Sequence, residues 1–365
     1  MFLYCKYETR LNELEDSFFP HSLLRRLWTK KSKSKKKRRN HSSNMNSLNS
    51  TLSPNTTFVR PPFFFINGFY DIPHAKYYYV FLCFVFVITV LGNSFVMFII
   101  YTERSFHTPK YLAIFNLAVA DLGESTALIP NLIATFLFDS QYISYDACLA
   151  NMFFVFFFSS LQALTLTVLA YDRLVAICLP LRYHAIITMP AMVVMLTVVW
   201  AYNSLFIIST LTLITRLSFC KSIVVQSYFC DHGPIYKLAC NDNLANSIMA
   251  KLYMVLFLYL PFILTVLSYV FIAFALFKVA SWEGRLKAIK TCSAHLMLVA
   301  LYFLPIMGTY IAALTFTLHP NARIINTSLA NAIPPMMNPI IYMLNTEEVK
   351  EFSKKLFKRK KNNHK

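Results

Sequence analysis

The chain has 365 residues, of which 56% are hydrophobic and 14% are charged, and its mean hydropathy is +0.48. A soluble protein of this length cannot bury so much apolar surface, so the composition excludes most soluble classes and indicates a membrane protein. The net charge of +18 does not indicate a nucleic-acid partner, because the basic residues gather in the two tails and in short loops.

Residue patterns that carry catalysis or hold a cofactor are absent from the sequence. The six glycines stand far apart, and no two of the nine histidines are spaced i, i+4. There is therefore no phosphate-binding loop and no helical zinc motif, and the GxSxG nucleophile motif is missing as well. We expect neither enzymatic activity nor a cofactor.

Seven apolar segments are each long enough to cross a bilayer as an α-helix, which requires about 20 residues. Six of them contain no Asp, Glu, Lys or Arg, whereas the second contains Asp121 and Glu124. Soluble helices rarely run so far without charge, so the sequence predicts an all-α membrane protein with a seven-transmembrane helix bundle. The predicted helices comprise residues 77–101, 111–138, 148–171, 189–214, 252–277, 291–318 and 324–344.

The distribution of basic residues predicts the orientation in the membrane. The loops after the first, third and fifth segments and the C-terminal tail carry 16 Lys and Arg, whereas the other connections from residue 45 onward carry 7. Because short cytoplasmic loops are enriched in Lys and Arg, we expect a multi-pass plasma-membrane protein with an extracellular N-terminus and a cytoplasmic C-terminus. The sequons at Asn49 and Asn55 fall on the predicted outer side and are candidate glycosylation sites.

A basic block precedes the predicted bundle. Residues 1–44 hold 12 Lys and Arg against four acidic residues, and translocating such a block is unfavourable. We interpret it as an extension upstream of a natural initiator at Met45, with a nuclear-localisation or nucleic-acid-binding tail as the alternative. Residues 45–76 are then an extracellular segment, and residues 77–345 form the transmembrane domain.

The C-terminal segment, residues 346–365, carries eight Lys and Arg against three Glu. Val349, Phe352 and Leu356 recur at i, i+3, i+7, a spacing that places them on one face of a helix. The pattern predicts a short amphipathic helix lying on the anionic lipids of the inner leaflet, and a solvated tail is the alternative.

Four of the eight cysteines lie on the predicted outer side, namely Cys148, Cys220, Cys230 and Cys240. An even number in an oxidising compartment indicates two disulfides, for which three pairings exist. The equal spacing of the last three favours a local Cys220–Cys240 bond, which leaves Cys230 for Cys148. Free thiols are the alternative.

Several motifs occur in a fixed order along the predicted helices. Gly92-Asn93 lies in the first, Asn116 to Asp121 in the second, Trp200 in the fourth, and Pro261 with Ser268-Tyr269 in the fifth. The third ends in AYDRLVAICLPLRY, the sixth begins with KAIKTCSAHL, and the seventh ends in PMMNPIIY. With these motifs and its three-cysteine outer loop, the chain resembles rhodopsin-like G-protein-coupled receptors over about residues 55–360. Within them it resembles odorant receptors, and its variants are more similar to the fish type.

The resemblance implies a function at the cytoplasmic face, where a heterotrimeric G protein of the stimulatory, cAMP-raising type would bind. Arg173 would contact the G protein and Asp172 would hold it in the resting state. Tyr269 and Tyr342 would move toward the core on activation. The resemblance also implies that Cys148–Cys230 is the outer disulfide of the family.

A polar core is the second feature that the resemblance implies. Asp121 and Asn338, with Asn93 nearby, would form a cluster in the bundle centre, with a candidate sodium site at Asp121. A structural alternative is that Asn93 and Asn338 satisfy the buried pair of Asp121 and Glu124. Proline removes a backbone hydrogen bond and favours a kink, which gives a helix two packings that a ligand can bias. The residues concerned are Pro261, Pro305 and Pro339.

The sixth helix lacks the Phe-Tyr-Gly that many mammalian odorant receptors show, and two further positions depart from the pattern of rhodopsin-like receptors. Phe303 stands where other rhodopsin-like receptors often have tryptophan, and Gln162 stands where the third helix often has an acidic residue. The departure at Phe303 concerns the switch mechanism and the one at Gln162 concerns the sodium site.

A ligand cavity is expected between the third, fifth, sixth and seventh helices, beneath the outer loop. Helical spacing from the motif residues predicts a mostly apolar lining without an acid from the third helix, which suits a small, moderately polar odorant better than a biogenic amine. A receptor for a non-odorant ligand and a membrane transporter are the alternative functions. The predicted lining is Val155, Phe156, Ser159, Ser160, Tyr253, Phe257, Phe303, Ile306, Tyr310, Ser328 and Asn331.

Overall fold

The computed structural model of the protein describes residues 59–68, 75–137, 141–220, 222–278, 281–315 and 320–345. Several predictions fall outside these residues and keep that status. They are the basic extension of residues 1–44, the sequons at Asn49 and Asn55, and the amphipathic helix of residues 346–365.

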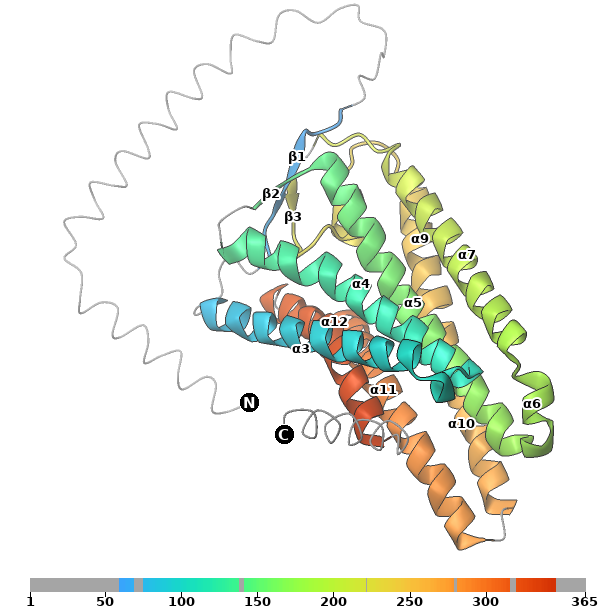
Figure 1. Cartoon of the computed structure of the whole chain (residues 1–365). Coiled ribbons are helices and arrows are strands. Elements are labelled where there is room, and N and C mark those ends of the chain that lie inside the picture. Colours follow the sequence, from blue (N-terminus) through green and yellow to red (C-terminus); the bar gives the residue numbers. More distant parts are fainter. Residues whose placement is uncertain are drawn as a thin grey trace, which may run out of the picture. The chain divides into compact units, whose positions relative to one another are not determined.

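Long helices occur at each of the seven predicted segments and form an all-α bundle (Figure 1). By length and composition, six of them could cross a membrane. The helix at the seventh segment is less apolar because asparagines and prolines interrupt its sequence. The helices are α3 (Ala75–Thr102), α4 (Pro109–Leu137), α5 (Tyr145–Cys178), α7 (Met189–Ile214), α9 (Leu244–Met254) with α10 (Leu260–Lys278), α11 (Trp282–Thr315) and α12 (Pro320–Asn345).

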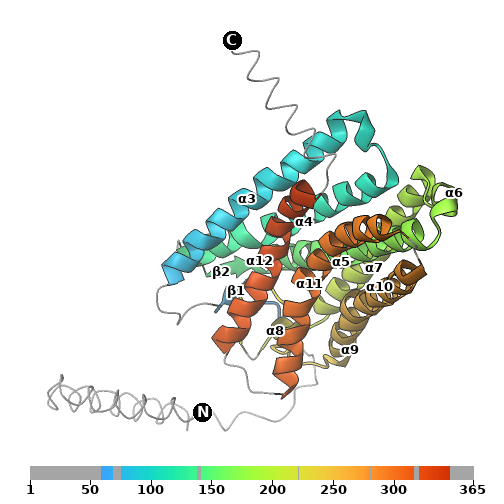
Figure 2. The same cartoon turned by 90° about the horizontal axis from the view of Figure 1, so that it is seen from below.

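Helix α5 lies at the centre of the packing. It contacts α4, α7, α10 and α11, while α12 packs between α3 and α11 (Figure 2). Asn116 of α4 joins three of these helices, because its amide donates to Thr165 Oγ1 on α5 at 2.8 Å and its carbonyl accepts from Trp200 Nε1 on α7 at 2.7 Å. Polar side chains within an apolar bundle thus fix which helix faces meet.

Three helices extend furthest beyond the predicted apolar segments. Helix α5 begins at Tyr145 rather than at residue 148 and ends at Cys178 rather than at residue 171, α9 begins at Leu244 rather than at residue 252, and α11 begins at Trp282 rather than at residue 291. Side chains cap two of these ends: Ser144 Oγ before α5 accepts from the Ala147 amide, and Ser281 Oγ before α11 accepts from the Gly284 amide. Hydropathy marks the apolar part of a helix, whereas capping and backbone hydrogen bonds decide where the helix ends.

A helical irregularity divides the fifth membrane segment. Residues Val255–Tyr259, labelled η3, form a π-helical turn between α9 and α10, immediately before Leu260 and Pro261. Proline cannot donate the backbone hydrogen bond that a regular α-helix needs, so a widened turn next to it is expected.

A small three-stranded sheet covers one end of the bundle. The central strand β1 (Phe63–Ile66) pairs antiparallel with β2 (Tyr142–Ser144) and parallel with β3 (Val224–Val225). The sheet joins the segment before α3, the α4–α5 connection and the α7–α9 loop, all of which the sequence placed on one side of the membrane. We call this end the strand end and the opposite end the Arg173 end; the latter carries η1 (Arg104–Phe106), η2 (Pro180–Arg182) and α6 (Tyr183–Ile186).

Two disulfides shape the α7–α9 loop at the strand end. Cys148 on the first turn of α5 is bonded to Cys230, with their Cα atoms 5.4 Å apart, and Cys220 is bonded to Cys240. The same loop contains α8 (His232–Tyr236), which begins directly after Asp231. The bonds hold the loop across the bundle and restrict the chain in the unfolded state, which stabilises the fold.

Candidate functional site

The predicted polar core lies where α4 meets α12. Asp121 is completely buried, and the Asn338 side-chain amide donates to both of its carboxylate oxygens at 3.0 and 2.8 Å. An ionisable group at this depth is costly unless it is satisfied, so the Asp121–Asn338 contact couples the two helices.

Asn93 is near this core but bonds to backbone instead. Its amide donates to the carbonyl oxygens of Thr89 and of Pro335, at 3.0 and 2.9 Å. The Pro335 carbonyl is available because its helical partner would be the amide of Pro339, and proline has none. Gly92 allows this approach, since a Cβ atom there would lie 2.8 Å from Pro339 Cγ. Helix α12 is therefore held by α3 at its proline segment.

The second buried acid has a different partner from the one expected. Glu124 accepts a 2.5 Å hydrogen bond from Gln162 Nε2 on α5, whereas only Asp121 is satisfied by asparagine. The alternative from the sequence was that Asn93 and Asn338 satisfy both buried acids. Of the contacts that it requires, the structure contains the one between Asp121 and Asn338. Gln162 was recognised as a departure from the family pattern, but its pairing with Glu124 was not predicted, because it depends on the relative rotation of α4 and α5.

The sodium hypothesis can be compared with the side chains around Asp121. Glu124 Oε1 and Ser125 Oγ are buried and have no hydrogen-bond partner in the described part of the chain. Oxygen donors suit a hard cation, so the residues fit sodium chemically. Among the described residues, no group of three or more His, Cys, Asp or Glu could hold a metal ion.

The Arg173 end contains the predicted ion pair. Arg173 Nη2 lies 2.8 Å from Asp172 Oδ2, and the hydroxyl of Tyr183 on α6 donates to Asp172 Oδ1 at 2.8 Å. Burial, followed by the Asp172 carboxylate, raises the pKa of Tyr183 well above its usual value, so the hydroxyl stays a donor. Asp172 is completely buried, and its carboxylate contacts both Arg173 and Tyr183 in the α5–α7 connection.

The two predicted tyrosines do not share one environment. The Tyr269 hydroxyl on α10 lies 2.8 Å from Nδ1 of His295, whose Nε2 is 3.1 Å from the Leu166 carbonyl on α5. A carbonyl only accepts, so Nε2 carries the proton and Tyr269 donates to Nδ1. The Tyr342 hydroxyl is buried without a hydrogen-bond partner in the described structure. The role of His295, which joins α5, α10 and α11, was missed, although the residue belongs to the KAIKTCSAHL motif.

A cavity of about 170 Å³ lies among α5, the η3 turn, α11 and α12, beneath the α7–α9 loop. Tyr302, which was not predicted, also lines it and donates a 2.6 Å hydrogen bond to the Ser159 carbonyl, so α11 is tied to α5 at the cavity wall. Further lining that spacing did not reveal comes from the loop residues Tyr228 and Asp231 and from Arg323 of α12. Of the predicted lining, the cavity contains Val155, Phe156, Ser159, Tyr253, Phe257, Ile306 and Asn331.

Three predicted lining residues face elsewhere, and this part of the prediction is corrected. Ser160 Oγ donates to Asn203 Oδ1 on α7, and the Ser328 and Tyr78 hydroxyls are hydrogen-bonded across α12 and α3. Phe303 is completely buried and packs on Phe262 of α10. Helical spacing predicts which residues share one face of a helix, but it does not predict which neighbouring helix packs against that face. The side chain of Tyr310 lies outside the described part of the structure.

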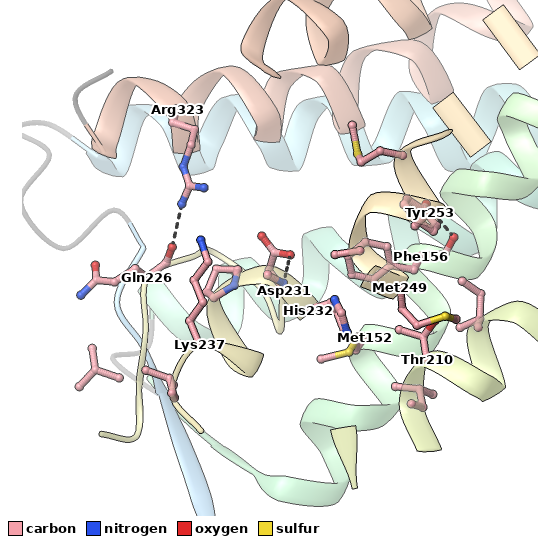
Figure 3. A pocket seen from close by; sticks show the side chains of 18 residues that line it. Met152, Phe156, Thr210, Gln226, Asp231, His232, Lys237, Met249, Tyr253 and Arg323 are labelled. Atoms are coloured by element: carbon pink, nitrogen blue, oxygen red, sulfur yellow. Dashed lines mark hydrogen bonds between the residues drawn. The ribbon is translucent and has the colours of Figure 1, made fainter. Parts of the chain in front are cut away.

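A second and larger cavity, of about 430 Å³, lies among α5, α7, α9 and the loop with α8. Figure 3 shows Arg323, Lys237 and Asp231 toward one side of it, with Phe156, Met249 and Tyr253 toward the other. Burial raises the pKa of Asp231, and burial lowers the pKa of His232 to about 4. His232 is therefore neutral at physiological pH. The sequence did not predict this cavity.

Comparison with known proteins agrees with these features. The fold is similar to that of squid rhodopsin, with a TM-score of 0.63 and 17% identity over 80% of this chain and 89% of that one. The fold and site define a seven-helix receptor of the rhodopsin type, and a family model described as "Olfactory receptor" matches residues 82–360.

Individual relatives give the same result. Olfactory receptor 1 of Rattus norvegicus is 33% identical over 79% of this chain and 91% of its own length. Olfactory receptor 1N2 of Homo sapiens is 36% identical over 74% of this chain and 86% of its own length. The chain belongs to the olfactory receptor family. It is therefore a multi-pass membrane receptor of the G-protein-coupled class and not an enzyme, and the transporter alternative is not supported.

Proposed function

We propose that this receptor binds a small organic odorant in the 170 Å³ cavity and activates a heterotrimeric G protein of the stimulatory, cAMP-raising type at the Arg173 end. The observation that carries the proposal is the Tyr302–Ser159 contact of 2.6 Å at the cavity wall. Helices α11 and α5 are also joined nearer to Arg173, where His295 contacts the Leu166 carbonyl. A ligand that changes the packing of α11 on α5 would therefore act on the helix that carries the ion pair.

The orientation proposed is that the strand end faces outward and the Arg173 end faces the cytoplasm. The Lys and Arg distribution supports it, and so do the two disulfides at the strand end, because disulfides persist in oxidising compartments. Residues 45–76 are then extracellular, residues 77–345 form the receptor domain and residues 346–365 lie at the cytoplasmic surface. Asn49 and Asn55 remain proposed glycosylation sites.

The surface of the Arg173 end supports a protein partner there. Leu181, in the short η2 turn, is 101% exposed. The turn is held by the Tyr183–Asp172 hydrogen bond, so the leucine is presented on a fixed support. An exposed leucine at the Arg173 end is suited to fill an apolar pocket of the G protein.

Lipids are the other proposed partner. Large apolar side chains point outward from the helices, including Phe84 on α3, Val198 on α7 and Phe274 on α10, each about 60% exposed. Hydrocarbon chains would cover them in the bilayer. Inside the bundle, Asp121 is the proposed sodium site.

Expression of the chain from Met45 in cells, with cAMP recorded against a panel of odorants, tests the function. We expect at least one odorant to raise cAMP and the response to disappear in Arg173→Ala at equal surface level. An odorant response that survives in Arg173→Ala would contradict the assigned role of that arginine, and a fall in cAMP would contradict the stimulatory type.

A further inference from the structure

We propose that Gly68, two residues after strand β1, is a positioning residue for the smaller cavity of about 170 Å³: its contact with the backbone of Tyr228 sets how far the covering loop reaches into that cavity, and so limits the size of the ligand. The proposal rests on the odorant site proposed above, because it concerns the size of the molecule that this site accepts. The segment of residues 59–68 thereby takes part in ligand selection without lining the cavity itself.

The segment of residues 59–68 is fixed to the bundle by backbone hydrogen bonds and by burial. Its strand β1 pairs with β2 on one side and with β3 on the other. The Pro62 carbonyl accepts from the Tyr145 amide, at the start of α5, at 3.1 Å. Phe64 and Ile66 are each 1% exposed and pack in the apolar cluster that contains the disulfide between α5 and the loop. Displacing the segment would break these hydrogen bonds and expose apolar side chains, so it is a rigid support.

Gly68 lies against the backbone of the α7–α9 loop. A Cβ atom at this position would lie 2.7 Å from Tyr228 Cα, and 2.8 Å from both the Tyr228 amide nitrogen and the Ser227 carbonyl oxygen. Carbon atoms that are not bonded pack at about 3.5–4.0 Å, so a side chain at residue 68 requires a shift of about 1 Å. Tyr228 lies in a bend between β3 and Cys230, outside the sheet, so the loop is the part that yields.

Tyr228 transmits this shift to the cavity. Its side chain is 2% exposed and lines the smaller cavity. Its hydroxyl accepts a 2.9 Å hydrogen bond from Asn331 Nδ2 on α12, which is also a lining residue. Gly68 therefore limits the position of the backbone, while Asn331 holds the far end of the ring. Because Gly68 contacts Tyr228 from the side away from the cavity, a shift caused by a side chain at residue 68 moves Tyr228 inward and leaves less room for a ligand.

Gly233 provides a matched control in the same loop. The nearest atom that a Cβ at this position would meet is Asp231 Oδ1, at 3.8 Å, which is an ordinary van der Waals contact. Gly233→Ala and Gly68→Ala therefore add the same methyl group, but only the second forces a backbone segment to move.

Size-dependent labelling of a thiol in the cavity tests the proposal without an odorant or a G protein. The thiol is introduced by Ile306→Cys, because Ile306 lines the smaller cavity, and this parent protein is purified as the full chain in lipid nanodiscs. It is treated with methyl or benzyl methanethiosulfonate, and the two rates of modification at residue 306 are read by peptide mass spectrometry. In Gly68→Ala the ratio of the benzyl rate to the methyl rate should fall by at least about fivefold, as expected for overpacking of a filled site. Gly233→Ala should keep the ratio of the parent.

Tyr228→Leu distinguishes positioning from a general loss of structure. Its smaller side chain should raise the benzyl-to-methyl ratio, and Gly68→Ala combined with Tyr228→Leu should return the ratio to about that of the parent. A ratio in Gly68→Ala equal to that of the parent would overturn the proposal, and so would a fall of the same size in Gly233→Ala. If both reagents react faster in Gly68→Ala at an unchanged ratio, the glycine has a structural role only.

The proposal stays testable if Gly68→Ala alone does not fold. Tyr228→Leu gives the loop room to yield, so the comparison is then between this variant and its combination with Gly68→Ala, and equal ratios in the two would overturn the proposal. Absence of a cAMP response to odorants would contradict the proposed function, whereas the labelling ratios report on the cavity alone.

Discussion

Replacing Asp172 with asparagine removes the negative charge that holds Arg173 while keeping the shape of the side chain. In the structure the carboxylate forms an ion pair with Arg173 at 2.8 Å and accepts a hydrogen bond from Tyr183 at 2.8 Å, and it is completely buried. Arg173 is 16% exposed, so solvent screens the pair only in part. An exposed ion pair contributes about 0.2–1 kcal/mol and breaking a buried one costs about 3–5 kcal/mol, so about 1.5–3 kcal/mol is expected for this partly screened pair.

If this contact exists only in the resting state, its loss shifts the equilibrium toward the active state by the same free energy. A change of about 1.4 kcal/mol is tenfold in an equilibrium constant, so we expect the active fraction to rise by about one to two orders of magnitude until it saturates. Basal cAMP, normalised to surface staining, is the readout. Tyr183→Phe is the control, because it removes one hydrogen bond but leaves the ion pair, and it should give a smaller rise. Unchanged basal cAMP in Asp172→Asn at equal surface level would refute the reasoning.

Three further predictions address other parts of the molecule. Leu181→Ala should lower the maximal cAMP response several-fold without changing odorant affinity, and a changed affinity at unchanged maximum would contradict its place in the G-protein interface. Asp121→Asn should abolish any increase in melting temperature that sodium chloride gives over choline chloride, and an equal increase in both proteins would exclude the carboxylate as the sodium ligand. Burial lowers the pKa of His232 to about 4. Between about pH 6.5 and about pH 4 the unfolded state therefore binds more protons than the folded state. The free energy of unfolding should fall by up to roughly 3 kcal/mol as the solution is acidified through this range. The raised pKa of Asp231 acts in the opposite direction, and the wild type should therefore be compared with His232→Gln; equal acid sensitivity of the two would contradict the burial of a neutral imidazole.

Much of the fold could be predicted from the sequence because membrane helices carry a strong local signal. The seven apolar segments and the contact between Asp121 and Asn338 follow from hydropathy and from motif residues in order. Helix ends such as Tyr145 and Trp282 could not be predicted, since polar residues continue these helices beyond the apolar part.

The site was predicted less completely because it depends on how the helices are rotated against each other. Helical spacing predicted that Ser159 and Ser160 line the same cavity. Other helices pack against α5 on several sides, however, and Ser160 is hydrogen-bonded to Asn203 of α7 instead. The contacts of Gln162 and His295 each require two helices to approach at a particular depth. The larger cavity depends on the path of the α7–α9 loop, for which hydropathy gives no signal.

The most direct test of the central claim uses the purified receptor, a purified stimulatory G protein and an odorant that activates the wild type in cells. The measurement is the rate of guanine-nucleotide exchange on the G protein with and without the odorant. We predict that the odorant accelerates exchange with the wild type, that Ile306→Trp, which fills the smaller cavity, removes the acceleration, and that Arg173→Ala removes it while odorant binding is kept. Undiminished acceleration by the odorant in Ile306→Trp would contradict the account.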